Sequence, residues 1–359
     1  MNNFKNKNIS LPLTYFLIVI VGFLALYSAS FSKGKIDNAA YISHQLVWII
    51  LSLVAIVVIL IIGYRRLLDF SYVLYTLGIF LLIYVILVAQ PRLGAVRWVS
   101  FGGINIQPSE LMKLIFILTL ARFLSSYKYN ENGIKCTFVA LALTGLPVLL
   151  IMMQPDLGTA LVFIPVALSM LYVWGFRLRY IVLMFFSAIA VSPLFWSLLK
   201  DYQKSRFMVF INPNADPLGS GYTIIQSKIA IGSGGFLGKG WLSGTQSQLN
   251  FLPEHHTDFI FSGIGEEWGF LGAMLIVALF YFLIIQGLDI AMHASSMSKK
   301  LLATGICVLI AMQVIINICM CIGLMPVVGL PLPYISYGGS AMIIFSVLMG
   351  ILFNIKFEV

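Results

Sequence analysis

The chain has 359 residues, of which 60% are hydrophobic and only 10% are charged, and its formal net charge is +9. A soluble globular protein carries about 25% charged residues, so this composition excludes a soluble domain and predicts an integral membrane protein. The positive charge does not indicate nucleic-acid binding, because Lys and Arg form no single stripe or face.

Hydropathy predicts an all-α polytopic membrane protein with about ten transmembrane helices, in which residues 1–359 form one transmembrane domain. The first apolar stretch follows a basic N-terminus and lacks a small-residue cleavage site, which favours a retained helix over a removed signal peptide. Pro193 interrupts the seventh stretch, which is therefore the weakest of the set. The expected spans are 11–31, 41–63, 67–89, 108–125, 136–153, 157–175, 179–199, 263–288, 301–323 and 335–355.

An even number of spans puts both termini on one side, and the Lys and Arg residues indicate which side. With the termini in the cytoplasm, the inner segments hold twelve of the 22 Lys and Arg residues and the short outer loops hold four. Acidic residues have the opposite bias, toward the outer side. The sequence therefore predicts cytoplasmic termini and a functional site that faces outward.

One outer segment, residues 200–262 between the seventh and eighth spans, is much longer than an ordinary loop and is expected to be functional. Its stretch 221–231 is amphipathic and is expected to lie in the membrane interface. The glycine run GSGGFLGKGW that follows predicts turns and close backbone approach. It is not a phosphate-binding loop, because Ser233 and Gly240 occupy the positions that require Gly and Ser or Thr.

The sequence EHHTD, residues 254–258, gathers ionisable side chains where this outer segment meets the eighth span. Two interpretations remain open for Asp258: it caps the helix that follows, or its carboxylate is a general base. Helical spacing would place Asp258, Ser262 and Glu266 on one face. His256 lies beside this carboxylate, and an acid such as Glu266 inside an apolar run needs a partner or a function.

The sequence QPSELMK predicts a helix that begins at Pro108 and carries Glu110 and Lys113 on one face. The two side chains form a structural ion pair inside the membrane, or Lys113 meets an anionic substrate that Glu110 helps to orient. In the outer loop before this helix, Arg97 is either a phosphate ligand or, with Trp98, an interface anchor.

Three further segments supply candidates. Asp156, in the turn QPDLG, is a helix cap or a substrate ligand. Arg206 in the long outer segment is a weaker phosphate candidate. Residues 326–340 contain three prolines, three glycines and Ser336, and cannot form a continuous helix. Broken backbone at membrane depth lines a cavity, although an ordinary loop is the alternative.

Four stretches together resemble the SEDS family, named for shape, elongation, division and sporulation. They are GAVRWVSFGGINIQPSELMK, QPDLGTA, the long segment from NPNADPL to HTDFIF, and GLPLPYISYGGS. The run GTQSQLNFLPE is more similar to the elongation branch of the family than to its division or sporulation branches.

This resemblance implies a peptidoglycan glycosyltransferase in the bacterial cell membrane that acts on lipid II and undecaprenyl-pyrophosphate-linked glycan. It implies that Asp258, in the matching motif HTDFIF, is catalytic, and that a class B penicillin-binding protein, the transpeptidase, is the partner. A departing pyrophosphate needs a cation, which Arg97 and Lys113 would supply, with Mg²⁺ or Mn²⁺ as an expected cofactor. The predicted substrate-binding residues are Arg97, Glu110, Lys113, Asp156, Arg206, His256, Glu266 and Ser336.

A lipid II flippase would share ten spans, broken helices and intramembrane acids. However, the inner halves of the predicted spans carry almost no charge, whereas transport needs a path from both sides. A scaffold that only recruits the transpeptidase would leave the cluster at 254–258 unexplained. The sequence therefore favours the polymerase over both alternatives.

Overall fold

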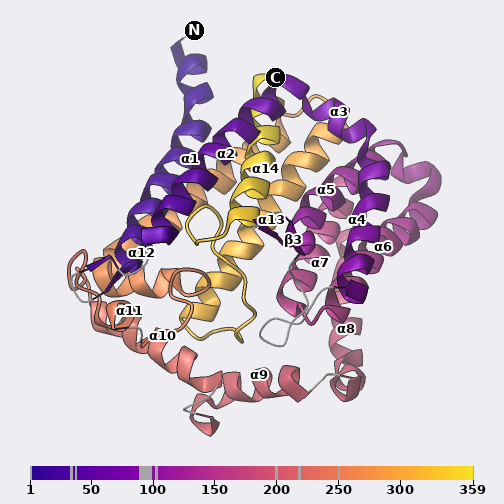
Figure 1. Cartoon of the computed structure of the whole chain (residues 1–359). Helices are drawn as coiled ribbons and strands as arrows, with labels where there is room; N and C mark the ends of the chain where they lie inside the picture. Colours follow the sequence, from indigo (N-terminus) through magenta and orange to yellow (C-terminus); the bar gives the residue numbers. More distant parts are fainter. Residues whose placement is uncertain are drawn as a thin grey trace.

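A computed structural model describes residues 2–32, 35–36, 39–88, 99–101, 104–198, 201–216, 220–249 and 251–358. Long helices form a bundle, and Figure 1 places both ends of the chain at the same end of it, as an even number of crossings requires. Two short antiparallel hairpins join β1 (Phe31–Ser32) to β2 (Lys35–Ile36) and β3 (Val99–Phe101) to β4 (Ile104–Ile106).

The helices follow the predicted order. Their bounds are α1 Asn2–Ala29, α2 Ala39–Ile62, α3 Tyr64–Asp69, α4 Ser71–Val88, α5 Pro108–Ser125, α6 Tyr129–Met153, α7 Leu157–Trp174, α8 Leu178–Leu198, α9 Asp201–Ile211, the 3-10 turn η1 Pro213–Ala215, α10 Ser220–Gly234, α11 Thr245–Gln248, α12 Ile260–Met292, α13 Met297–Cys321 and α14 Gly339–Phe357.

Within the described ranges, eight helices are long and apolar enough to cross a membrane: α1, α2, α4, α6, α7, α12, α13 and α14. Helices α5 and α8 lie at the two remaining predicted positions. Helix α5 carries Glu110, Lys113 and Arg122 in its 18 residues, which lowers its hydropathy. Large apolar side chains such as Ile61 and Leu87 are exposed on the outside of the bundle, as lipid-facing positions are. The chain is a multi-pass membrane protein.

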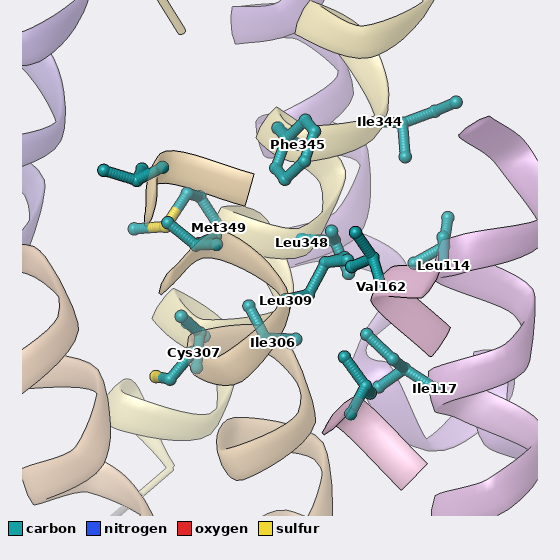
Figure 2. Packing of buried hydrophobic residues seen from close by; sticks show 14 of the residues in the cluster. Leu114, Ile117, Val162, Ile306, Cys307, Leu309, Ile344, Phe345, Leu348 and Met349 are labelled. Atoms are coloured by element: carbon teal, nitrogen blue, oxygen red, sulfur yellow. The ribbon is translucent and has the colours of Figure 1, made fainter. Parts of the chain in front are cut away.

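Helix α13 is the most enclosed of these helices and packs against α5, α7, α12 and α14. Figure 2 shows Leu309 and Ile306 of α13 among Leu348, Val162 and Ile117 from three neighbouring helices. Small residues allow this close packing. At Gly305, an added Cβ would lie 2.8 Å from a side-chain sulfur of α7.

The predicted long outer segment is largely helical. Helices α9 and α10 run across the end of the bundle that lies away from the two termini (Figure 1). The amphipathic stretch 221–231 falls inside α10, which packs on α12. This segment therefore covers the end of the bundle away from the two termini and reaches the start of α12.

Helix α12 is not the continuous span predicted at 263–288. Gly269 has φ 63° and ψ −159°, a conformation that breaks the helix and is accessible mainly to glycine. The uninterrupted part therefore follows Gly269 and ends at Met292. Glu266 and Glu267 precede the break, in a short helical piece that is buried against the outer segment.

Candidate active site

Asp258 lies in a series of turns immediately before α12. The helix begins at Ile260, and its N-cap is Phe259, which makes no side-chain capping bond. Of the two interpretations of Asp258, the structure does not place it at the N-cap position, which Phe259 occupies. The shared face with Ser262 and Glu266, expected if the segment were helical, does not form, because Asp258 precedes the helix. Residues before a helix start do not follow its 3.6-residue period.

The backbone of this turn is held by the segment before α14. The amide of Tyr337 donates to the carbonyl of His256 at 2.8 Å, and the Ser336 hydroxyl donates to the carbonyl of Thr257 at 2.6 Å. Ser336 Oγ also accepts from the Leu332 amide at 2.8 Å. Ser336 thus fixes the turn through its backbone, and its predicted contact with substrate stays a prediction.

The carbonyl of Asp258 has its own partner in α13. Asn317 Nδ2 donates to it at 2.8 Å and to the carbonyl of Leu330 at 2.7 Å. An added Cβ at Gly329 would lie 3.3 Å from Asp258 Oδ2, so the carboxylate rests against this glycine. The backbone carbonyls of His256, Thr257 and Asp258 therefore all accept hydrogen bonds. The half-buried Asp258 side chain extends from a fixed backbone.

Residues 322–338 are irregular and include most of the stretch 326–340 for which the sequence predicts broken backbone. Arg206 and the Asp258 turn contact this irregular segment. Arg206 Nη1 donates to the carbonyl of Val327 at 3.2 Å. Gly158, in the first turn of α7, approaches Val328 so closely that an added Cβ would lie 2.8 Å from its carbonyl oxygen. The segment thus gathers residues from α7, α9, α13 and the Asp258 turn at one place.

Glu110 and Lys113 form the predicted ion pair, with 2.7 Å between Lys113 Nζ and Glu110 Oε1, and both side chains are almost fully buried. Lys113 also donates to Gln313 Oε1 at 2.9 Å, and Gln313 Nε2 donates to the carbonyl of Pro331 at 3.0 Å. The pair therefore supports the irregular segment through Gln313. Only 1% of the Lys113 side chain is exposed, so it contacts no open surface here.

Asp156 is the N-cap of α7, as one interpretation of the sequence predicts. Its carboxylate accepts from the Thr159 amide at 3.3 Å and from the Thr159 hydroxyl at 2.9 Å. Gln107, the residue before Pro108 at the start of α5, donates to Asp156 Oδ2 at 3.1 Å. Asp156 therefore joins the beginnings of two helices, and its substrate contact stays a prediction.

Glu266 is fully buried, and its hydrogen-bond partners belong to residues 239–246. Its Oε1 accepts from Lys239 Nζ at 2.6 Å, from the Thr245 amide and hydroxyl at 2.8 Å each, and from the Gln246 amide at 3.1 Å. These charge-assisted bonds fold residues 235–248 onto α12. The geometry gives Glu266 a structural role, whereas its predicted contact with substrate has no support in these bonds.

The glycine run pairs with the break in α12, as close backbone approach predicts. Gly238 has φ 81°, and an added Cβ would lie 2.1 Å from the Glu267 carbonyl oxygen, so only glycine fits. Four backbone bonds satisfy the groups that the broken helix leaves unpaired: Lys239 N to Glu266 O at 3.0 Å, Gly240 N to Glu267 O at 3.0 Å, Phe270 N to Gly235 O at 2.9 Å and Leu271 N to Phe236 O at 3.3 Å.

His256 lines a cavity of about 430 Å³ beside the Asp258 turn. Its ring lies 4.8 Å from that of Tyr41 and 4.0 Å from that of His255, between ring centroids. Burial, with a smaller effect of His255, lowers the pKa of His256 to about 4. The imidazole is therefore neutral near pH 7, and Tyr41 and Tyr337 give the cavity aromatic walls.

Some residues of the site escaped the sequence analysis. Asn317 is a fully buried polar residue within an apolar helix, and this signal could have singled it out. Tyr41 and Tyr337 carried no comparable signal. Arg97 lies outside the described residues. In the part of the chain that the structure describes, no group of three or more His, Cys, Asp or Glu side chains could hold a metal ion, so Mg²⁺ or Mn²⁺ stays a prediction.

Comparison with known proteins decides the family. The model of the cell cycle protein family FtsW, RodA and SpoVE matches residues 8–359. The chain belongs to this family. It is the SEDS family whose motifs the sequence resembles.

Curated relatives of this family member include peptidoglycan glycosyltransferase MrdB of Escherichia coli K12, 44% identical over 283 residues, which are 79% of this chain and 76% of the relative. Stage V sporulation protein E of Bacillus subtilis is 38% identical over 95% of this chain and 94% of its own length. Peptidoglycan glycosyltransferase RodA of Treponema pallidum is 32% identical over 96% of both chains.

Solved structures of the family share the fold. A chain from a peptidoglycan synthase complex, described for its coordination of polymerisation and crosslinking, superposes with a TM-score of 0.83 at 31% identity over 97% of both chains. The rod shape determining protein RodA of Thermus thermophilus superposes with a TM-score of 0.70 at 27% identity, over 97% of this chain and 96% of that chain.

Proposed function

We propose that this chain is a peptidoglycan glycosyltransferase that polymerises lipid II into glycan strands for cell elongation and cell shape. One observation carries the proposal: Asp258 is half-buried on a turn whose backbone is tied down at three carbonyls. The names of the relatives support the same reaction. A fixed carboxylate at the end of a membrane bundle suits a substrate whose lipid tail stays in the bilayer.

In the proposed reaction, Asp258 accepts the proton of the 4-hydroxyl of the acceptor sugar. The hydroxyl oxygen then attacks the anomeric carbon of the donor glycan, and the bond from this carbon to the pyrophosphate oxygen breaks. A single displacement converts the α-linked pyrophosphate into a β-1,4 glycosidic bond, and undecaprenyl pyrophosphate leaves. General base catalysis of this kind contributes about 10²–10⁴-fold to the rate.

The departing pyrophosphate requires positive charge. Arg206 suits this role better than Lys113, because Arg206 is exposed beside the irregular segment whereas Lys113 is enclosed and paired. A guanidinium can hold two phosphate oxygens at once. Arg97 keeps its place as a sequence-based candidate.

The test is polymerisation of labelled lipid II by the purified chain with its cognate transpeptidase in detergent. We expect Asp258→Asn to lower the rate by about 100-fold or more. The matched control is Asp289→Asn, which replaces a half-exposed acid near the far end of α12 that pairs with His293, and it should polymerise like wild type. Ladders of wild-type intensity from Asp258→Asn would show that another group is the base.

The partner proposed for this chain is a class B penicillin-binding protein of the elongation complex, supported by a similar chain in a complex that coordinates polymerisation and crosslinking. The active site would face outward from the bacterial cell membrane, where lipid II and the transpeptidase meet. If wild type gives no ladders but moves lipid II across liposome membranes, the chain is a flippase instead.

A further inference from the structure

A second cavity, of about 390 Å³, lies at the other end of the bundle from Asp258. It is bounded by α3, by Arg122 near the end of α5, and by the first turn of α13. Figure 1 shows α3 beside the chain's C-terminus, at the end opposite α10. The part of α12 after Gly269 alone separates the two sites by about 35 Å, so this cavity is not part of the glycosyltransferase site.

Three cations line the cavity: Arg65, Arg122 and Lys299. Asp69 lines it as well and pairs with Arg122. Glu358 lies 3.4 Å from Arg65 Nη2 and 3.6 Å from Lys299 Nζ, so one carboxylate is shared by two cations. Three positive charges therefore face two negative ones, and the cavity has a net positive charge.

Lys299 is the most enclosed of the three cations. Its side chain is only 5% exposed, and its distance to Glu358 is too long for a hydrogen bond. Its ion-pair partner Glu358 is shared with Arg65, and the ammonium carries three donors. The shared carboxylate leaves donors of this ammonium available to an acceptor in the cavity.

The first turn of α13 adds donors at the same place. Ser296 caps the helix by accepting from the Lys299 amide at 3.4 Å, and Ser298 lines the cavity one residue before Lys299. The positive end of the dipole of this 25-residue helix and its first free amides face a bound anion favourably. Side chains and backbone thus both present donors.

The charge bias that sets membrane orientation does not explain this cavity. Exposed or half-exposed residues such as Arg66 and Lys300 satisfy the positive-inside rule at no cost in burial. Lys299 has the same charge but is buried against the cavity wall. Glu358 and a bound anion would both suit a cation placed in this way, whereas membrane orientation does not require such a placement.

We propose that this cavity binds the phosphate group of a small ligand at the membrane surface, which in the expected topology is the cytoplasmic surface. Phosphate offers only acceptors to the donors of Lys299, Arg122 and the start of α13. The group belongs either to the headgroup of an anionic phospholipid or to a free phosphate. A site of this kind would make the enzyme sensitive to an anion on the side of the membrane opposite its chemistry.

The experiment measures binding to the full-length protein in a neutral detergent. The probes are dioctanoyl phosphatidylglycerol and inorganic phosphate, and phosphate-free dioctanoylglycerol is the reference. We expect Lys299→Gln to weaken binding of the phosphate probe by about tenfold or more, since a charged hydrogen bond is lost. Lys300→Gln, the adjacent lysine outside the cavity lining, should change it by less than about twofold.

A second variant distinguishes loss of phosphate binding from a folding defect in Lys299→Gln. Ser298→Asp adds an acid to the first turn of α13, which favours the helix but repels a phosphate, so binding should fall by about tenfold while the thermal midpoint is kept. Binding of phosphatidylglycerol alone assigns the lipid as the source, and binding of both probes shows that phosphate suffices. Binding of neither probe, or equal effects of Lys299→Gln and Lys300→Gln, overturns the proposal.

Discussion

At the scale of single residues, the position of Asp258 depends on Asn317. The amide group of this buried side chain donates to two carbonyls, those of Asp258 and Leu330, and so joins the Asp258 turn to the irregular segment. Asn317 acts on the backbone of Asp258 and is therefore a positioning residue. A carboxylate held loosely would lose the orientation on which proton transfer depends.

Replacing Asn317 with Asp keeps the shape of the side chain but removes the donor. We expect kcat for lipid II polymerisation to fall by about tenfold or more, with KM changed much less, because orientation rather than substrate binding is lost. The measurement is steady-state kinetics, with the exposed Asn212→Asp as control. A rise in KM with an unchanged kcat would contradict a positioning role.

The neutral His256 predicts how stability depends on pH. Its pKa is lowered from 6.5 to about 4, so the unfolded chain takes up this proton first as the pH falls. The stability that is present at pH values above the pKa of the unfolded state is therefore lost progressively as the pH decreases toward the pKa of the folded state. Burial also lowers the pKa of His255, which acts in the same direction.

We expect the thermal midpoint of wild type to decrease between pH 7 and pH 5, and to decrease less in His256→Phe. Phenylalanine keeps the ring beside Tyr41 but cannot be protonated. His44→Phe, which replaces an exposed histidine, should retain the wild-type dependence on pH. Identical pH curves for wild type and His256→Phe would mean that this histidine is not buried in its neutral form.

At the scale of elements, the break in α12 and the glycine run of the outer segment form one unit. The broken helix exposes backbone groups, and residues 235–240 supply complementary ones at distances of 2.9 to 3.3 Å. Glu266 and Lys239 lock the same contact through side chains. This unit fixes the helical piece that follows the Asp258 turn.

Gly269→Ala tests the unit. An added Cβ would lie 2.3 Å from the Gly238 amide nitrogen, and the positive φ disfavours any residue but glycine. We expect a loss of at least about 2 kcal/mol in stability, seen as a lower thermal midpoint and reduced polymerisation. Gly263→Ala is the control in the same helix, where an added Cβ meets nothing within 4 Å, and it should leave both properties unchanged. Equal thermal midpoints and equal polymerisation in the two variants would show that the break at Gly269 and the glycine run do not act as one structural unit.

At the scale of the whole molecule, the two cavities and the two termini define opposite ends of the bundle. Both termini and the cation-lined cavity lie at one end, and the Asp258 turn lies at the other. The excess of Lys and Arg at the end with the termini predicts that this end is cytoplasmic.

Labelling of single cysteines from one side of the membrane tests this orientation. In intact cells whose outer barrier is opened, a membrane-impermeant maleimide should modify Glu254→Cys but not Ser295→Cys, since both positions are exposed at opposite ends. Ser295→Cys should react only after the membrane is permeabilised. A Cys319→Ser background removes the one native cysteine that is not buried. The reverse pattern would place the active site in the cytoplasm.

The sequence by itself determined the class of the protein and the order of its helices, and it singled out Asp258 as a candidate. Apolar runs of about 20 residues must be helical in a bilayer, because the backbone has no other partners there. Local signals also placed the start of α5 at Pro108, the Asp156 cap and the irregular segment around Ser336. Each of these depends on neighbours only a few residues apart.

Only the tertiary structure decided what each buried polar group does. Helical periodicity assigned Glu266 to the face of Asp258, but its partners are Lys239 and Thr245, more than 20 residues away along the chain. The hydrogen bonds from Lys113 to Gln313 and from Asn317 to the Asp258 carbonyl join segments separated by up to 200 residues. A carboxylate in a low-dielectric bundle takes the donors that the fold brings within reach, and a pattern of neighbours cannot specify which donors those are.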